Sequence, residues 1–174
     1  MSGEEGGFAG VVRQATPADA AAVSRVLHAS YDALYRGWYR DGVLEKALPA
    51  MTRANPILLN SGKYFVAELD GAIVACGGWS ADRPTGGAIS RLAHLRHFAT
   101  DPDYLNRGCG GAIVRRCFNE ARALGFVEFE VISSLTAEAF YARHGFMQIA
   151  VVRQPMGGVD FACVLMRKKL EIDE

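Results

Sequence analysis

A glycine-rich turn is the first feature of the sequence that could do chemistry. The segment PDYLNRGCGGAIVRRC places Gly108 and Gly110 where an extended run gives way to a helical pattern. The first backbone N–H groups of a helix have no partner within the helix, and they lie at the positive end of its dipole. Glycine lets an anion approach this backbone and tolerates a positive φ angle. The turn is therefore a candidate phosphate site, although plain turn geometry would also explain its glycines.

Two common nucleotide motifs do not match this turn. The chain contains no G-x-x-x-x-G-K-[ST] sequence, and the G-x-G-x-x-G pattern fails because Ile113 stands at its last glycine position. No acidic residue stands out at the end of a following strand, where it could bind a ribose. A P-loop phosphotransferase and a nicotinamide dehydrogenase are therefore disfavoured.

The composition is that of an ordinary globular domain. The chain has 174 residues, of which 50% are hydrophobic and 22% charged, and a chain of this length buries roughly 70% of the surface that its unfolded form exposes. Nineteen Lys and Arg residues balance nineteen Asp and Glu residues. Proteins that bind nucleic acid by displacing counterions normally carry a basic excess. We therefore expect no nucleic-acid partner.

The sequence also gives expectations about location and metals. No apolar run approaches the roughly 20 residues that cross a bilayer, and the opening MSGEEGGFAG is acidic and glycine-rich. We expect no membrane contact and no metal, and we interpret the cysteines as reduced thiols of a cytoplasmic protein. The four cysteines, which form no C-x-x-C pair and no zinc-like cluster with histidine, are Cys76, Cys109, Cys117 and Cys163.

Hydrophobic periodicity and turn signals predict a mixed order of strands and helices. Residues 1–10 are expected to form a flexible tail before a single domain over 11–174. Thr16 and Pro17 are typical of a helix start, Pro49 of a helix end, and Asp70-Gly71 of a tight hairpin. Strands are predicted from residue 11 and over 63–69, 72–79, 88–100, 126–133, 147–153 and 160–166. Helices are predicted up to 34, over 41–48, from the glycine-rich stretch 108–111 to 124, and over 136–144.

This order has one strand-helix-strand crossover at its centre and hairpins at its flanks, which indicates an α/β fold with a layered sheet. With that order, residues 11–170 resemble the GNAT superfamily of N-acetyltransferases. The resemblance is carried by VVRQATPADAAAVSRVL at the start, by FATDPDYLNRGCGGAIV in the middle, and by SLTAEAFYARHGF after the next strand. It implies a mixed, mostly antiparallel sheet with helices on both faces, and acetyl-CoA as the acetyl donor.

The resemblance also implies a set of cofactor contacts. Gly108 and Gly110 match the pyrophosphate-binding glycines, with neighbouring amides from Arg107, Cys109, Gly111 and Ala112. Phe98, Ala99 and Thr100 match the splayed strand that holds the acetyl carbonyl and the pantetheine arm. The chain departs from the family pattern at Leu105, where Gln or Arg is usual, and at Ser134, where Asn is frequent; Ser134 could still contact the cofactor through its hydroxyl.

The catalytic expectations follow from the same resemblance. Tyr141 matches the tyrosine beside the thioester sulfur, where a hydrogen bond would favour departure of the thiolate. His94 is the expected base, through water or as the attacking nitrogen becomes acidic, and Glu130 is the fallback. Each has a plain structural alternative: Tyr141 as a core residue and His94 as a hydrogen-bonded strand residue. His97, on the opposite strand face, is interpreted as structural.

The acceptor is the least readable part of the sequence. Tyr31, Tyr35, Trp38 and Tyr39 match the region that shapes the acceptor pocket, although they could equally pack a helix on the sheet. The resemblance predicts an acetyltransferase for a small-molecule amine or an exposed amino group, and the late strand pair could join a second copy in a homodimer. Two alternatives stay open: a catalytically silent acyl-CoA-binding sensor, and an interaction protein with an empty loop.

Overall fold

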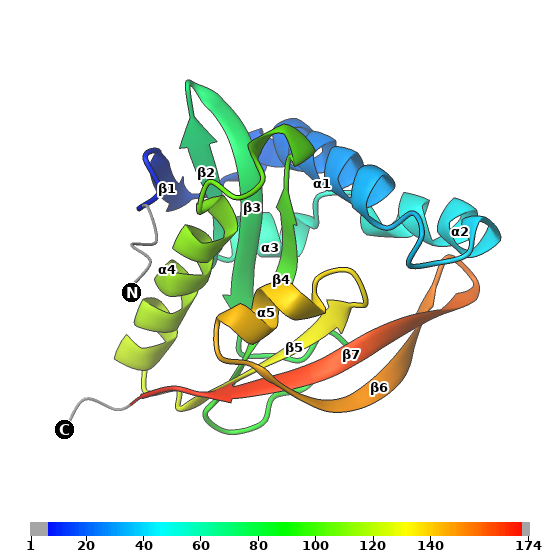
Figure 1. Cartoon of the computed structure of the whole chain (residues 1–174). Coiled ribbons are helices and arrows are strands. Elements are labelled where there is room, and N and C mark those ends of the chain that lie inside the picture. Colours follow the sequence, from blue (N-terminus) through cyan, green and yellow to red (C-terminus); the bar gives the residue numbers. More distant parts are fainter. Residues whose placement is uncertain (1–6, 172–174) are drawn as a thin grey trace, which may run out of the picture.

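A seven-stranded sheet organises the chain in the computed structural model, which describes residues 7–171 (Figure 1). The order across the sheet is β1-β2-β3-β4-β5-β7-β6. β4 and β5 run parallel, and the other neighbouring pairs run antiparallel. The strands are β1 (Val11–Gln14), β2 (Tyr64–Leu69), β3 (Ala72–Ser80), β4 (Leu92–Thr100), β5 (Glu128–Ser134), β6 (Met147–Met156) and β7 (Val159–Lys169).

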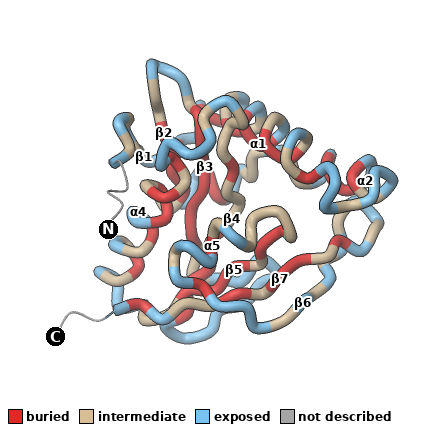
Figure 2. Tube along the Cα trace, viewed as in Figure 1, coloured by how far each residue is buried: buried red, intermediate tan, exposed pale blue. Residues whose placement is uncertain are grey.

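Helices cover both faces of this sheet, which confirms the expected fold class. Two separate apolar cores result, and Figure 2 shows the buried positions along the sheet and along the inner sides of the helices. One core lies under α4 and α5, and the other under the first three helices. The helices are α1 (Ala20–Leu34), α2 (Asp41–Met51), α3 (Pro56–Asn60), α4 (Cys109–Ala123) and α5 (Glu138–Arg143), with short 3-10 turns at Pro17–Asp19 and Pro102–Tyr104.

The local turn signals are confirmed where they are strongest. Asp70 and Gly71 have φ angles of 53° and 77°, as the tight turn between β2 and β3 requires. At the 3-10 turn that leads into α1, the backbone N–H of Thr16 donates to the Asp19 carboxylate at 2.8 Å, a contact of the expected capping arrangement. α4 ends before Gly125, which has a φ of 86°.

Several boundaries differ from the prediction. Pro49 lies inside α2 rather than ending it; near the helix end a proline removes only one backbone bond, and the Thr52 N–H still donates to Leu48. β4 begins at Leu92, four residues later than expected. α3 was not predicted, although Asn55 before Pro56 is a helix-start signal, because the helix is only five residues long.

The structure also differs from the prediction near the N-terminus and in the β6–β7 hairpin. Phe8 packs against the core under α4, so part of the expected tail is ordered; residues 1–6 lie outside the described residues. The β6–β7 hairpin extends further than predicted, to a turn at Gly157 and Gly158, and its tip reaches α2 (Figure 1).

No helix between residues 7 and 171 combines the length and apolar character needed to cross a membrane.

Candidate active site

The sheet opens between its two parallel strands. β4 and β5 are paired over residues 92–94 and 128–130, and their pairing then ends. Beyond this point a cavity of about 270 Å³ is lined by residues 95–98 of β4 and 131–134 of β5. Backbone groups that no longer bond to a neighbouring strand can bind an extended ligand, so the gap is a natural slot for a chain-like molecule.

A bulge bends β4 beside this cavity. The pairing with β3 shifts register there, and His97 has a φ of 56°. Opposite the bulge, a Cβ added to Gly77 would lie 2.6 Å from the Phe98 ring, so only glycine lets that ring take its place. The Tyr64 and Tyr31 hydroxyls donate to the carbonyls of His97 and Phe98 at 2.7 and 2.8 Å. The bent path of β4 is therefore fixed by side chains from β2 and α1.

The three residues predicted to hold the acetyl group and the pantetheine arm divide at this bulge. Phe98 lines the cavity. Ala99 and Thr100 lie further along β4, where they pair with β3, and they are outside the cavity lining. Their contact with a cofactor therefore stays a prediction.

The glycine-rich turn forms the N-terminal cap of α4. Gly108 has a φ of 78°, in the left-handed region that favours glycine. Residues 109–111 form the first turn of α4, where backbone N–H groups have no acceptor within the helix. The N–H of Ala112 donates to the carbonyl of Gly108 at 3.0 Å. The structure thus leaves the amides of 109–111 for an anion, but not the predicted amide of Ala112.

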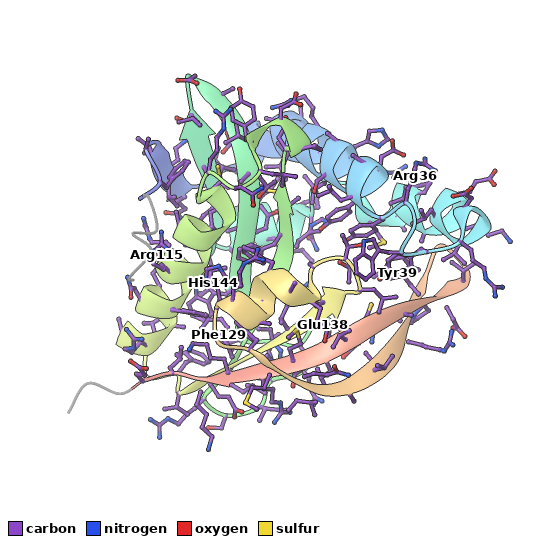
Figure 3. The ribbon with its side chains drawn as sticks, viewed as in Figure 1. Arg36, Tyr39, Arg115, Phe129, Glu138 and His144 are labelled. Carbon is purple, nitrogen blue, oxygen red and sulfur yellow. The ribbon has the colours of Figure 1, made fainter. Side chains whose placement is uncertain are left out.

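Glycine in this turn also permits close packing against α5. A Cβ added to Gly110 would lie 3.0 Å from the Phe140 ring, and one added to Gly111 would lie 3.2 Å from His144. Figure 3 shows His144 in this region between the two helices. The Arg107 guanidinium lies 5.0 Å from the centre of the Tyr104 ring. The glycine-rich turn therefore packs directly against α5, the helix that carries Tyr141.

Tyr141 and Ser134 approach the cavity from the β5 side. Tyr141 is 5% exposed and lines the cavity, with its ring edge-on to Phe98 at 6.2 Å between centres. Burial raises the pKa of the Tyr141 phenol well above its usual range, so the hydroxyl stays protonated and can donate a hydrogen bond. Ser134 lines the cavity too, and its Oγ accepts from the Ala137 N–H at 3.2 Å.

The four aromatic residues expected at the acceptor pocket separate into two pairs. Tyr31 and Tyr35 are buried, line the cavity, and stack at 4.7 Å between ring centres. Trp38 is 57% exposed and lies outside the cavity lining. The Tyr39 hydroxyl donates to the carbonyl of Ala162 at 2.7 Å and accepts from the N–H of Leu135 at 2.8 Å. Tyr39, which Figure 3 shows near the end of α1, thus joins β7 to the segment after β5, and its contact with an acceptor stays a prediction.

The two residues expected to act as bases lie beneath the gap rather than in it. His94 is 1% exposed and outside the cavity lining, because it belongs to the last residue pair that joins β4 to β5. Its Nδ1 is 3.6 Å from Glu130, whose carboxylate accepts from Arg167 at 2.8 Å. Burial lowers the pKa of His94 despite the neighbouring carboxylate. Direct proton transfer from a substrate to His94 or Glu130 is therefore not what this geometry offers.

His97, interpreted from the sequence as structural, does line the cavity. Its Nε2 is 2.8 Å from the carbonyl of Met51, which can only accept, so Nε2 carries the proton and Nδ1 is the basic nitrogen. Burial lowers the pKa of His97, which keeps the ring neutral near pH 7. The bulge is the reason for its position, because strict alternation along β4 would not place adjacent residues 96 and 97 on one wall.

Sequence reasoning missed most of the outer wall of the cavity. This wall comes from the end of α2, from α3, from the loop before β4 and from the β6–β7 hairpin, all distant in sequence from the glycine-rich turn. Nothing in the local sequence signals these contacts. The residues concerned are Ala50, Met51, Asn55, Leu58, Pro84, Gln154, Met156, Phe161 and Cys163. Arg96, on β4 itself, was missed as well.

Comparison with known proteins agrees with this geometry. Residues 60–148, just over half of the chain, match the family model described as an acetyltransferase (GNAT) domain. An amino-acid acetyltransferase of Azotobacter vinelandii is 36% identical over 94 residues, which are 54% of this chain and 20% of that protein. The chain thus matches only about one fifth of the length of this curated relative.

Solved structures share the fold over most of the chain. A GCN5-related N-acetyltransferase structure from Rhodopseudomonas palustris has a TM-score of 0.77 at 22% identity, covering 92% of this chain and 96% of that one. A GNAT family acetyltransferase from Brucella melitensis in complex with acetyl-CoA has a TM-score of 0.57 at 20% identity, covering 96% and 92%. A protein from Mycobacterium tuberculosis in complex with CoA is 31% identical, with a TM-score of 0.55, covering 80% and 73%.

The chain belongs to the GNAT family of acetyltransferases. The Brucella structure, which shares this fold, is in complex with acetyl-CoA. The residues present fit this molecule: after the left-handed cap at Gly108, the amides of 109–111 have no acceptor within α4, and the gap between β4 and β5 begins where strand pairing stops.

Proposed function

We propose that the protein is an N-acetyltransferase that moves the acetyl group from acetyl-CoA to a primary amine, by direct attack while both substrates are bound. The observation that carries the proposal is the cavity between the diverging strands, which has Tyr141 on one side and the bulge of β4 on the other. The acceptor would be a small-molecule amine or an exposed amino group. The name of the Azotobacter relative makes a free amino acid the first candidate.

Acetyl-CoA would supply an activated acyl carbon and a thiolate leaving group. The amides of residues 109–111 would hold its diphosphate, and the positive end of the α4 dipole supports this. Backbone groups of β4 at the gap would align the pantetheine arm and polarise the carbonyl oxygen, without any side chain being required.

Tyr141 would stabilise the thiolate by donating a hydrogen bond. A phenol with an ordinary pKa near 10 is already a weaker acid than a thiol near 8.5, and burial makes the Tyr141 phenol weaker still. Complete proton transfer is therefore unfavourable, whereas a hydrogen bond in a closed site is strong. A retained phenol beside the cavity is also the reason that we do not favour the catalytically silent alternative.

For the proton on the amine we propose His97 as the acceptor. Support comes from its place in the cavity lining and from the Met51 contact, which leaves Nδ1 basic. Transfer from an ordinary ammonium to imidazole is uphill by about four pK units, or about 5 kcal/mol. His97 would therefore act once the nitrogen has begun its attack or through water. The earlier prediction of His94 requires a water chain and becomes the alternative in the test.

The test is an assay of CoA release with purified protein, acetyl-CoA and a panel of amines. Acetylated product in equal amount to released CoA would support the proposal, whereas CoA binding by calorimetry without turnover of any amine would support the silent alternative. Failure to bind CoA would refute both. His97→Gln should remove the acid limb of the pH dependence of kcat/KM, and His94→Gln should leave it; the opposite result would make His94 the base.

A cytoplasmic location and a homodimer are further proposals. The four cysteines are free and buried, which suits a reducing compartment. β6 is an edge strand, and Met147, Ile149 and Val151 on it are each more than half exposed. Such an edge could receive a second copy. Sedimentation of the purified chain over a range of concentrations would test this.

A further inference from the structure

Arg96 is the one side chain in the cavity lining that carries a formal charge at neutral pH, within residues 7–171. No aspartate or glutamate lines the cavity in that part of the chain, and His97 is neutral because burial lowers its pKa. An acceptor whose only charge is an ammonium would therefore meet a guanidinium and no carboxylate. The wall is electrostatically suited to a molecule that brings a negative charge with its amine.

The guanidinium of Arg96 is oriented by a hydroxyl rather than by a carboxylate. Its Nη1 donates to the Ser80 hydroxyl at 3.0 Å, and that hydroxyl donates to the carbonyl of Asp82 at 2.7 Å, so Ser80 is itself fixed. Two other arginines that are tied into the fold have a carboxylate as partner: Arg13 contacts Asp19 at 2.8 Å, and Arg167 contacts Glu130 at the same distance.

Arg96 is partly buried with no carboxylate of residues 7–171 within ion-pair distance, and this affects its pKa. The Arg96 side chain is half-buried, and burial lowers its pKa although Asp82 opposes the shift. The guanidinium nonetheless stays charged, because an arginine does not lose its proton in a protein near neutral pH. A planar fork with free N–H groups matches a carboxylate, which it can bind with two parallel hydrogen bonds.

We infer that the acceptor amine carries a carboxylate and that Arg96 is the residue that binds it, so that the substrate class is amino acids rather than plain alkylamines or polyamines. The inference rests on the proposed function. Arg96 lies on β4 two residues before Phe98, which places the carboxylate site next to the bulge and the amine toward the gap between the strands. Arg96 is thus a specificity-determining residue that does no chemistry on the acetyl group.

The test compares each free amino acid with its own carboxamide, which keeps the side chain but lacks the negative charge and has a less basic amine. In the wild type, kcat/KM should be at least tenfold higher for the acid. Arg96→Gln should lower kcat/KM for the acid by roughly 10- to 100-fold, mainly through KM, and leave the carboxamide unchanged. For Arg96→Lys, kcat/KM for the acid should lie between those of the wild type and Arg96→Gln, because lysine keeps the positive charge but loses the planar pair of N–H donors.

A control variant is offered by Arg153, which is exposed on β6 beside the lining residue Gln154 but is itself outside the lining. Arg153→Gln should keep the full preference for acids. The melting temperature and the affinity for CoA should stay unchanged in both Gln variants. Equal use of acids and carboxamides by the wild type, or an equal loss for both in Arg96→Gln, would overturn the inference while leaving the transferase proposal intact.

The carboxylate site can also be tested if the transferase proposal fails. If no amine is acetylated, the transferase proposal fails, and the carboxylate site is judged from the melting temperature of the CoA-loaded protein. A rise with amino acids but not with carboxamides, absent in Arg96→Gln, would still support the site. No rise with any amino acid would overturn it.

Discussion

Two buried tyrosines allow the chemistry at the gap to be separated from the packing around it. Tyr141→Phe removes one hydroxyl and keeps the ring contacts with Phe98, Phe140 and Phe146. A hydrogen bond to a charged group contributes about 1.5 to 3 kcal/mol, and one decade in rate corresponds to about 1.4 kcal/mol. We therefore expect kcat to fall by roughly 10- to 150-fold with a melting temperature changed by only about 1–2 °C.

Tyr39→Phe is the matched control, with the opposite pattern. Its hydroxyl bridges the Ala162 carbonyl and the Leu135 N–H, and leaving these groups without a partner should lower the free energy of unfolding by about 1 to 3 kcal/mol. The hydroxyl does not line the cavity, so kcat below the melting transition should stay within about twofold of the wild type.

The assay is CoA release at saturating acetyl-CoA between pH 7 and 9, with urea unfolding measured on the same samples. Because burial raises the pKa of Tyr141, the phenol is protonated throughout this range, and the ratio of wild-type to Tyr141→Phe rates should not change with pH. Equal rates in Tyr141→Phe and the wild type would remove the phenol from the mechanism. A loss of stability in Tyr141→Phe as large as that of Tyr39→Phe would make it a packing residue.

Three further predictions concern the loop, the cavity histidine and the start of the first helix. Gly108→Ala and Gly125→Ala both force alanine into a left-handed conformation, at about 1–2 kcal/mol each; calorimetry should show weakened CoA binding for Gly108→Ala alone, and equal affinities would argue against the loop. Because burial lowers the pKa of His97, its contribution to stability is complete above the unfolded pKa of about 6.5 and is lost as the pH falls toward the folded value; urea midpoints from pH 5 to 8 should therefore fall less steeply toward acid in His97→Gln, and identical slopes would contradict this. Asp19→Asn should reduce the free energy of unfolding by about 1 kcal/mol at pH 7, because it weakens the contacts to the Thr16 N–H and to Arg13. The pKa of Asp19 is lowered chiefly by the hydrogen bond from Arg13, so the difference from the wild type should shrink as the pH falls below the ordinary value of 3.8 and through the lowered pKa.

The sequence by itself determined the features that depend on neighbours along the chain. Asp70-Gly71 predicted the hairpin, because only a few residues tolerate two successive positive φ angles. Gly108 and Gly110 predicted the turn before α4, and the helical spacing after them predicted α4 itself. The family resemblance and acetyl-CoA followed from the same short stretches.

Tertiary structure alone decided which side chains meet at the cavity. Where the pairing of β4 and β5 stops depends on contacts between segments far apart in sequence, and this left His94 beneath the gap. The bulge, held by tyrosines from α1 and β2, broke the two-residue alternation and brought Arg96 and His97 onto one wall. Local periodicity does not indicate such bonds, because they join residues that are far apart in the sequence.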